Sequence, residues 1–229
     1  MIQSNKNTNK TYEIDKNVME VELPTLRGSQ RIYLFFKRML DIVGSFCALL
    51  VLLPFFLIVA IAIKLDSPGS VFFKHERVGK RGQPFNMFKF RSMVDNAFLK
   101  EKDFHHLNDS TGPFFKIKDD PRITKLGRFL RKHSIDELPQ FLNVFLGHMS
   151  LVGPRPLVYR EIKELPGHVK NLIVKPGLTC YWQLSGRSDS SAELRIALDE
   201  KYIETFSLPV DLILLLRTPM AMLKGEGAY

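Results

Sequence analysis

Two adjacent carboxylates are the residues best suited to do chemistry. Asp136 and Glu137 lie in the run from Ser134 to Gln140, directly before an apolar stretch that is predicted to be helical. A carboxylate can act as a nucleophile toward phosphorus, and a helix N-terminus helps to hold anionic oxygens. The pair therefore predicts a catalytic centre in which Asp136 attacks a phosphate or binds a metal and Glu137 handles protons. The alternative is structural, because Ser134 with Glu137 three residues later also matches a capping box.

Such a centre needs positive charge, since a carboxylate that approaches a diphosphate is repelled by it. We expect the cations to be Lys89, Arg91 and Arg131, with Arg128 as a further candidate. Mg²⁺ fits as well, because it prefers one or two carboxylates together with phosphate oxygens and water. The predicted metal ligand is Asp136. No arrangement of Cys and His in the sequence indicates zinc.

A proline-arginine-proline run provides a second candidate binding element. Pro154 and Pro156 fix the backbone on either side of Arg155, so its guanidinium would be presented to a phosphate or a base at low entropic cost. We therefore predict Pro154, Arg155 and Pro156 as substrate-binding residues. The alternative is a rigid loop without a ligand. Trp182, the sole tryptophan, is expected to pack in the core or at a membrane interface.

Several predicted elements would position these groups. Residues 71–93 contain two runs of aromatic and β-branched residues around a glycine-containing turn, which predicts a β-hairpin. Residues 94–120 are expected to form a helix and then a loop. Residues 123–133 place their apolar side chains on one helical face. Residues 206–223 are apolar but interrupted by charges and prolines, which fits either an amphipathic surface helix or a buried core helix.

The strongest membrane signal is the run from Ile42 to Ile63, whose 22 residues carry no charge. As a helix it would reach roughly 33 Å, enough for a hydrocarbon core of about 30 Å. Pro54 lies near its midpoint and favours a bend, because it removes a backbone hydrogen bond. Basic residues flank the run on both sides, so the positive-inside rule favours two cytoplasmic ends and a re-entrant hairpin. Taken alone, the segment slightly favours an ordinary single span.

Composition limits the partners. The chain has 229 residues and carries 33 Lys and Arg against 24 Asp and Glu, a formal net charge of +9. This charge suits a partner with phosphate, such as nucleic acid, anionic lipid or a sugar nucleotide. The two cysteines do not suggest a disulfide framework. We divide the chain into a polar tail whose composition fits disorder (1–30), a membrane segment (31–66) and a cytoplasmic catalytic domain with membrane-surface helices (67–229).

Several short motifs follow one another along the chain, namely Lys37-Arg38 through Asp41, Phe88 to Met93, Asp120 to Thr124, Ser134 to Gln140, Gly147 through Pro156, Pro176 to Thr179 and Ser185-Gly186-Arg187. Each motif alone is weak, and their joint order is specific. In this order and spacing they resemble the bacterial sugar transferase family, the monotopic phosphoglycosyl transferases that begin exopolysaccharide, O-antigen or glycoprotein glycan assembly. The resemblance extends from about Phe36 to Tyr229.

The resemblance implies a covalent mechanism in two steps. The residue that matches the family's catalytic aspartate, Asp136, would attack the sugar-bearing phosphate of a UDP-sugar and release UMP. Undecaprenyl phosphate would then take the phosphosugar from the protein. Glu137 matches the second carboxylate of the family dyad, and the run Pro154 to Pro156 matches a nucleotide-binding motif. Mg²⁺ is the implied cofactor. Galactose or glucose is the first expectation for the sugar. The expected location is the cytoplasmic face of the inner (plasma) membrane.

The resemblance also implies the fold: an α+β, mainly helical monotopic membrane protein with a proline-kinked re-entrant helix, a small β-hairpin and amphipathic surface helices. Two positions depart from the family pattern. Leu53 stands where a serine commonly precedes the kink proline, and Cys180 stands where a glycine often follows the Pro-Gly-Leu-Thr run. The second departure raises the question of whether a positive φ is needed at Cys180.

Two other functions stay open. One is a non-catalytic, membrane-anchored basic module that binds anionic lipid or nucleic acid, although it leaves the carboxylates and the Pro-Arg-Pro run without a role. The other is a glycosyltransferase that moves the sugar without its phosphate and so releases a nucleoside diphosphate. Our expected partners are the UDP-sugar, undecaprenyl phosphate and membrane lipid, without nucleic acid, and a homodimer is left open.

Overall fold

The computed structural model describes residues 28–97, 104, 106–108, 117, 119–164, 166–185 and 192–224. The first 27 residues of the predicted polar tail lie outside these ranges. So do Gly186 and Arg187 and most of the predicted helix and loop over 94–120. The first helix, α1 (Gly28–Asp66), begins within the last three residues that we assigned to the tail.

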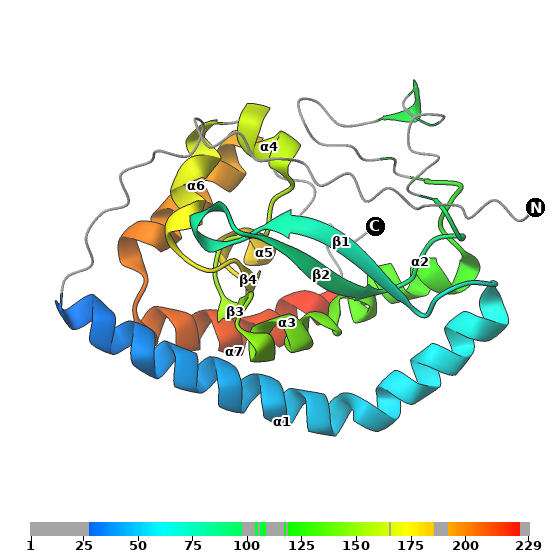
Figure 1. Ribbon diagram of the computed structural model, residues 1–229, viewed down its shortest axis with the longest axis horizontal. Coiled ribbons are helices and arrows are strands. Elements are labelled where there is room, and N and C mark those ends of the chain that lie inside the picture. Colours follow the sequence, from blue (N-terminus) through cyan, green and yellow to red (C-terminus); the bar gives the residue numbers. More distant parts are fainter. Residues whose placement is uncertain are drawn as a thin grey trace, which may run out of the picture.

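The long helix α1 contains the uncharged run and runs along one side of the molecule, beneath the other elements (Figure 1). Its segment Ile32–Asp66 is long and apolar enough to cross a membrane. The most apolar 18-residue stretch within it has a mean hydropathy of 3.1, and only 11% of that stretch is buried. Pro54 lies inside the helix, and the helix axis changes direction along its length (Figure 1). An exposed apolar surface of this size is typical of contact with a membrane or another protein.

Polar residues in the first half of α1 tie it to the rest of the chain. The buried carboxylate of Asp41 accepts hydrogen bonds from the Ser150 hydroxyl at 2.9 Å and from the Leu151 amide at 2.8 Å. Lys37 Nζ lies 2.6 Å from the Asp211 carboxylate, and both groups are buried. These contacts fix which face of α1 packs inward, because buried charges are costly unless they are paired.

The predicted hairpin is confirmed. Strands β1 (Phe72–Val78) and β2 (Pro84–Phe90) pair antiparallel, with Phe72 opposite Phe90, and the turn between them is the 3₁₀ segment η2 (Lys80–Gly82). Arg81 in this turn has a φ of 55°. Figure 1 shows the hairpin crossing the middle of the molecule, with its open end near the end of α1, where Phe90 packs against Phe56 at a ring distance of 5.1 Å.

The other elements are two further strands and a series of helical segments. Strands β3 (Ser150–Val152) and β4 (Gly177–Thr179) pair in parallel. The remaining elements are α2 (Lys125–Lys132), η4 (Ile135–Glu137), α3 (Gln140–Leu146), α4 (Tyr159–Glu164), η5 (Pro166–Ile173), α5 (Tyr181–Leu184), α6 (Ala192–Thr205) and α7 (Leu208–Lys224).

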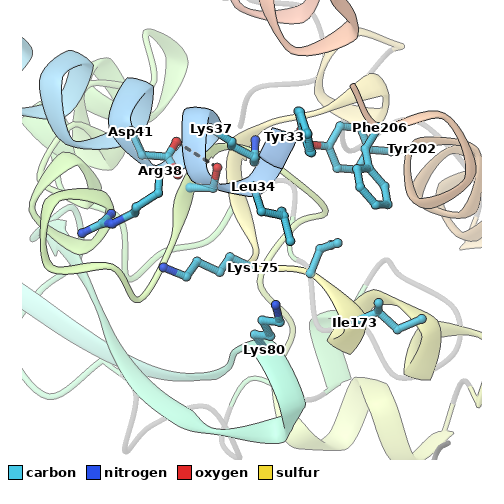
Figure 2. A pocket seen from close by; sticks show the side chains of 12 residues that line it. Tyr33, Leu34, Lys37, Arg38, Asp41, Lys80, Ile173, Lys175, Tyr202 and Phe206 are labelled. Atoms are coloured by element: carbon cyan, nitrogen blue, oxygen red, sulfur yellow. Dashed lines mark hydrogen bonds between the residues drawn. The ribbon is translucent and has the colours of Figure 1, made fainter. Parts of the chain in front are cut away.

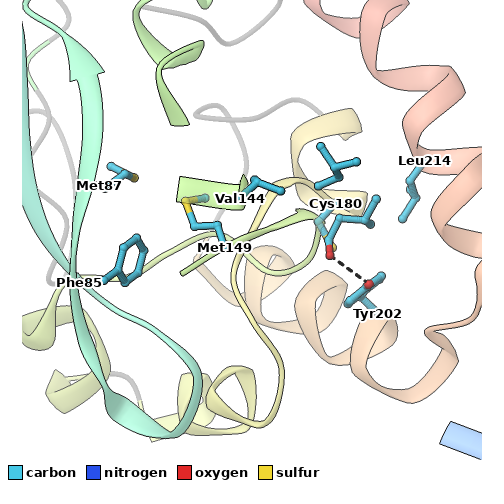
Figure 3. Packing of buried hydrophobic residues seen from close by; sticks show 9 residues of the cluster. Phe85, Met87, Val144, Met149, Cys180, Tyr202 and Leu214 are labelled. Carbon is cyan, nitrogen blue, oxygen red and sulfur yellow. Dashed lines mark hydrogen bonds between the residues drawn. The ribbon is translucent and has the colours of Figure 1, made fainter. Parts of the chain in front are cut away.

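The main core lies between the hairpin and the C-terminal helices (Figure 3). Phe85 and Met87 of β2 belong to the same buried cluster as Met149, Cys180 and Leu214. Cys180 has a φ of −161°, which is extended backbone, so this position does not require glycine. Cys47 and Cys180 are both free thiols, and the sequence indicated no disulfide framework for them.

Helix α7 combines the two alternatives that the sequence left open. Asp211 and Leu214 are buried against the core. The opposite side is exposed and apolar, with Leu216 at 79% and Met220 at 68% exposure. The chain is therefore a mainly helical protein with a small hairpin and one long apolar helix, an architecture compatible with a monotopic membrane protein.

Candidate functional site

The carboxylate pair lies in η4, in the short connection between α2 and α3. Ser134 precedes it with a φ of 54°, and its side chain makes no cap hydrogen bond to this turn. The alternative interpretation as a capping box is therefore wrong, because the left-handed backbone at Ser134 differs from the extended conformation of an N-cap residue. The pair also precedes the first residue of α3, Gln140, rather than beginning that helix as predicted.

Lys89 connects the hairpin to the carboxylates. Its Nζ donates to Glu137 Oε1 at 2.7 Å and lies 3.9 Å from Asp136 Oδ2. The three residues thus form one charged group, although Lys89 and Glu137 are 48 positions apart in the sequence. The prediction that Lys89 supplies positive charge near the pair agrees with this geometry.

Asp136 is buried, whereas the Glu137 side chain is 36% exposed. Burial raises the pKa of the Asp136 carboxyl above its ordinary value. The positive charges of Lys89 and Arg131 oppose this rise, and the charge of Glu137 adds to it. Arg131 is oriented by a hydrogen bond from its Nε to the Ser92 hydroxyl at 2.9 Å. The charged form of Asp136 therefore depends on these two cations.

The Pro-Arg-Pro run lies at a small cleft that Glu137 also lines. Arg155 and Pro156 line it together with Glu137. The rest of its wall is formed by residues of β2, α3, β4 and α5, namely Met87, Gln140, Gly177, Leu178 and Gln183. Pro154 is buried next to them and accepts a hydrogen bond from the Gly177 amide at 2.9 Å through its carbonyl. The structure thus brings together the two candidate motifs, which lie far apart in the sequence.

A close backbone contact holds this loop in place. Gly153 and Gly177 approach so closely that a Cβ on Gly177 would lie 2.1 Å from the Gly153 amide nitrogen. No side chain fits at that distance, which explains the glycine in the Pro-Gly-Leu-Thr run. The parallel pairing of β3 with β4 therefore positions Pro154 and Arg155.

Two further guanidinium groups, those of Arg195 and Arg77, lie near Arg155, and the sequence did not predict them as site residues. Arg155 and Arg195 each lie 5.1 Å from the ring centroid of Trp182, at cation-π distance. Trp182 is buried, as expected, but it also orients these two cations. Arg77 reaches the carbonyl of Pro156 at 3.3 Å. The presence of a single tryptophan was the one sequence signal for this arrangement. The spacing between residues 182 and 195 does not predict that their side chains stack.

Arg91 and Arg128 lie elsewhere. The buried guanidinium of Arg91 donates to the carbonyl of Ser67 at 2.6 Å and to that of Pro68, just beyond the end of α1. These contacts anchor the end of α1, and the predicted substrate contact of Arg91 stays a prediction. Arg128 is exposed on α2. We leave both residues out of the site that we propose.

The donor set of the site can be compared with the needs of Mg²⁺. Within the ranges that the structure describes, no group of three or more His, Cys, Asp or Glu side chains could hold a metal alone. Asp136 and Glu137 offer two adjacent carboxylates, and Mg²⁺ commonly takes one or two from the protein and completes its shell with phosphate oxygens and water. The pair therefore fits an ion that is held jointly with a phosphate.

These features define a class: a mainly helical protein with one long apolar helix and a candidate centre of two carboxylates beside several cations. The chain belongs to the bacterial sugar transferase family, whose model matches residues 32–225.

Curated relatives share about two fifths of their aligned residues with this chain. The UDP-galactose-lipid carrier transferase of Erwinia amylovora is 42% identical over 204 residues, which cover 85% of this chain and 42% of that protein. The exopolysaccharide production protein ExoY of Sinorhizobium fredii is 40% identical over 198 residues, covering 84% and 88%. The undecaprenyl-phosphate galactose phosphotransferase of Salmonella typhimurium is 38% identical over 229 residues, covering 97% and 48%. The chain thus spans less than half of two of these relatives.

Proposed function

We propose that this chain transfers a hexose 1-phosphate from a UDP-sugar to undecaprenyl phosphate, releases UMP and so begins exopolysaccharide or related glycan assembly. One observation carries the proposal: Glu137, next to Asp136 and bound to Lys89, lines the same cleft as Arg155 and Pro156. A carboxylate nucleophile and a phosphate-binding loop would both be needed there. The printed names of the relatives, with galactose and a lipid carrier among them, support this substrate class.

The proposed reaction has two displacements at one phosphorus atom. An oxygen of Asp136 attacks the sugar-bearing phosphorus of the UDP-sugar, the bond from that phosphorus to UMP breaks, and UMP leaves. The phosphosugar is then held on Asp136 as an acyl phosphate. An oxygen of undecaprenyl phosphate next attacks the same phosphorus, which returns the Asp136 carboxylate and gives a polyprenyl diphosphate sugar.

The neighbouring residues have separate roles in this proposal. Lys89 and Arg131 oppose the rise in the pKa of Asp136 that burial causes, and so favour the ionised form of the nucleophile. Arg155, held over Trp182, faces the cleft side where the nucleotide phosphates would bind. Asp136 and Glu137 would hold Mg²⁺ together with the diphosphate, and the ion would neutralise charge on the leaving UMP.

The proposed location follows from α1. We infer that Pro54 marks a bend at which the helix turns back, so that residues 31–66 enter and leave the membrane on the cytoplasmic face of the inner membrane. Residues 67–229 would then form one cytoplasmic catalytic domain. The exposed apolar sides of α1 and α7 would both lie in the lipid.

The released nucleotide distinguishes the candidate functions. Purified protein is incubated with Mg²⁺, undecaprenyl phosphate and a panel of UDP-sugars, and both products are identified by mass. We expect UMP and a polyprenyl diphosphate sugar, with UDP-galactose or UDP-glucose as donor. Release of UDP would instead indicate glycosyl transfer, and a protein that binds the lipid but releases no nucleotide from any donor would be a non-catalytic module.

A further inference from the structure

A second cation-lined cavity lies away from the carboxylate pair, between the first half of α1 and the turn of the hairpin (Figure 2). Its volume is about 130 Å³, and it is open to solvent on one side. Lys80 extends into it from η2, and Lys175 reaches it from the loop before β4. Leu34, Val174 and Phe206 contribute apolar surface to its lining.

The acidic side chains near this cavity already have partners. Asp41 accepts hydrogen bonds from Ser150 and Leu151, and Asp211 is bound by Lys37, Tyr33 and Tyr202. Within the described ranges, no carboxylate lies within ion-pair distance of the Lys80 or Lys175 ammonium group. The two lysines therefore bring positive charge to the cavity without a counter-ion from these parts of the protein.

A third cation meets Lys175 at the end of α3. A Cβ placed on Gly147 would lie 3.2 Å from Arg38 Nη2 and 3.4 Å from Lys175 Nζ. Arg38 is already engaged, since it donates to the carbonyls of Val144 at 2.7 Å and Phe145 at 2.8 Å. Burial lowers the pKa of Lys175, and the charges of Arg38, Lys80 and Lys37 lower it further, whereas the charge of Asp41 opposes this. An anion in the cavity would relieve this repulsion.

The cavity adjoins the apolar surface of α1. Tyr33, Leu34 and Lys37 line it, whereas the intervening Phe35 and Phe36 are exposed at 64% and 56%. The cavity and the exposed apolar side therefore lie on different sides of one helix, whose diameter is about 10 Å.

We propose that Lys80 and Lys175 form a binding site for the phosphate headgroup of an anionic lipid, whose hydrocarbon chain follows the apolar side of α1. The site is separate from the proposed reaction centre, because β2 places roughly 17 Å between Pro84, beside the turn, and Lys89. The headgroup phosphate could belong to a membrane phospholipid or to polyprenyl phosphate. The site does not depend on the proposed transfer reaction.

Protection of the two lysines from acetylation tests the site. The full chain is reconstituted in nanodiscs of phosphatidylcholine alone, or with phosphatidylglycerol or undecaprenyl phosphate at equal mole fraction. A further sample of the phosphatidylcholine discs receives inorganic phosphate. Limited acetylation is then measured by peptide mass spectrometry, with the exposed Lys125 and Lys163 as internal controls.

We expect an anionic lipid to lower acetylation of Lys80 and Lys175 severalfold relative to the two controls, with inorganic phosphate having little effect. Protection by phosphatidylglycerol identifies a membrane phospholipid as the ligand, and protection by undecaprenyl phosphate alone identifies a polyprenyl headgroup. Equal labelling in all discs, or protection by free phosphate without any effect of lipid, overturns the proposal.

A matched pair of variants gives a second measurement. Lys80→Gln/Lys175→Gln and the control Lys125→Gln/Lys163→Gln lose the same charge. Retention of phosphatidylglycerol through purification should fall about tenfold in the first variant only, because two charge-assisted hydrogen bonds are lost. Equal retention in both contradicts the site. If the first variant does not fold, the acetylation result on the unchanged protein decides.

Discussion

The position of Asp136 combines two opposing requirements. The side chain is nearly excluded from water, which disfavours its charge, yet the proposed reaction needs that charge. Lys89 resolves the conflict, since its ammonium group lies 3.9 Å from Asp136 and donates to Glu137 at 2.7 Å. The proposed nucleophile is thus tuned by a residue on the hairpin.

Asp136→Asn should abolish release of UMP while the protein still folds and remains in the membrane, because the two side chains have nearly the same shape. The exposed Asp119→Asn is the matched control, since it removes one carboxylate elsewhere. Release is measured by chromatography of the nucleotides. Full activity of Asp136→Asn would remove Asp136 from the mechanism.

Lys89→Gln should shift the acid side of the pH-rate profile toward higher pH. The pKa of Asp136 is already raised by burial, so the ionised fraction is lost as pH falls through that raised value. Lys89 counteracts the rise, and without it the loss begins at a higher pH. The measurement is kcat/KM for UMP release across pH. An acid limb that stays in place, or moves to lower pH, would contradict this account of Lys89.

At the scale of elements, the Lys37-Arg38 through Asp41 motif is an attachment rather than a catalytic feature. Each side chain contacts a different part of the chain: Lys37 contacts α7, Arg38 contacts the end of α3, and Asp41 contacts β3. These contacts hold α1 against α3, β3 and α7 in one orientation about its own axis. Its apolar side and the cleft consequently keep a fixed relation to each other.

Asp211→Asn tests this attachment. Asp211 is fully buried and accepts hydrogen bonds from Lys37 at 2.6 Å, Tyr33 at 2.7 Å and Tyr202 at 2.9 Å. Removing its charge leaves Lys37 unpaired, which typically costs about 3–5 kcal/mol. The midpoint of thermal unfolding in detergent should therefore drop clearly, whereas the exposed Glu204→Gln should leave it unchanged.

The double variant Lys37→Met/Asp211→Leu should recover part of this loss, because both charges disappear together. If Asp211→Asn is as stable as the unchanged protein, the buried ion pair does not hold α1 in place.

Local sequence patterns predicted the helices and strands well, but they did not predict which groups the charged side chains contact. The hairpin follows from alternating residues around Gly79 to Gly82, and α1 follows from its uncharged run. Arg91 and Arg155 both occur in basic motifs, yet one binds carbonyls beyond α1 and the other lies over Trp182. Contacts between distant parts of the chain determine which partner each arginine has. The strands β3 and β4 have three residues each, too few to give a periodic signal.

For the whole molecule, the apolar sides of α1 and α7 and the cation-lined cleft lie on one mainly helical body. A site of this kind suits a reaction between a water-soluble donor and a lipid acceptor, because the donor can enter from the cytoplasm while the acceptor stays in the bilayer. Membrane topology is therefore part of the proposed function.

Single cysteines at positions 35 and 67, in a chain with Cys47 and Cys180 replaced by serine, should both react with a membrane-impermeant maleimide from the cytoplasmic side only. This result is expected because basic residues flank both ends of the apolar run. Inverted and right-side-out vesicles provide the two arms of the measurement. Labelling from opposite sides would show a true span.

The central claim is a bond between an oxygen of Asp136 and phosphorus. Its most direct test is intact-protein mass spectrometry after incubation with Mg²⁺ and the UDP-sugar while undecaprenyl phosphate is withheld. We predict an added mass of one hexose phosphate, located on the peptide that contains Asp136, absent from Asp136→Asn and removed when undecaprenyl phosphate is supplied. If UMP is released in the full reaction but no phosphosugar is ever attached to the protein, the covalent mechanism is contradicted.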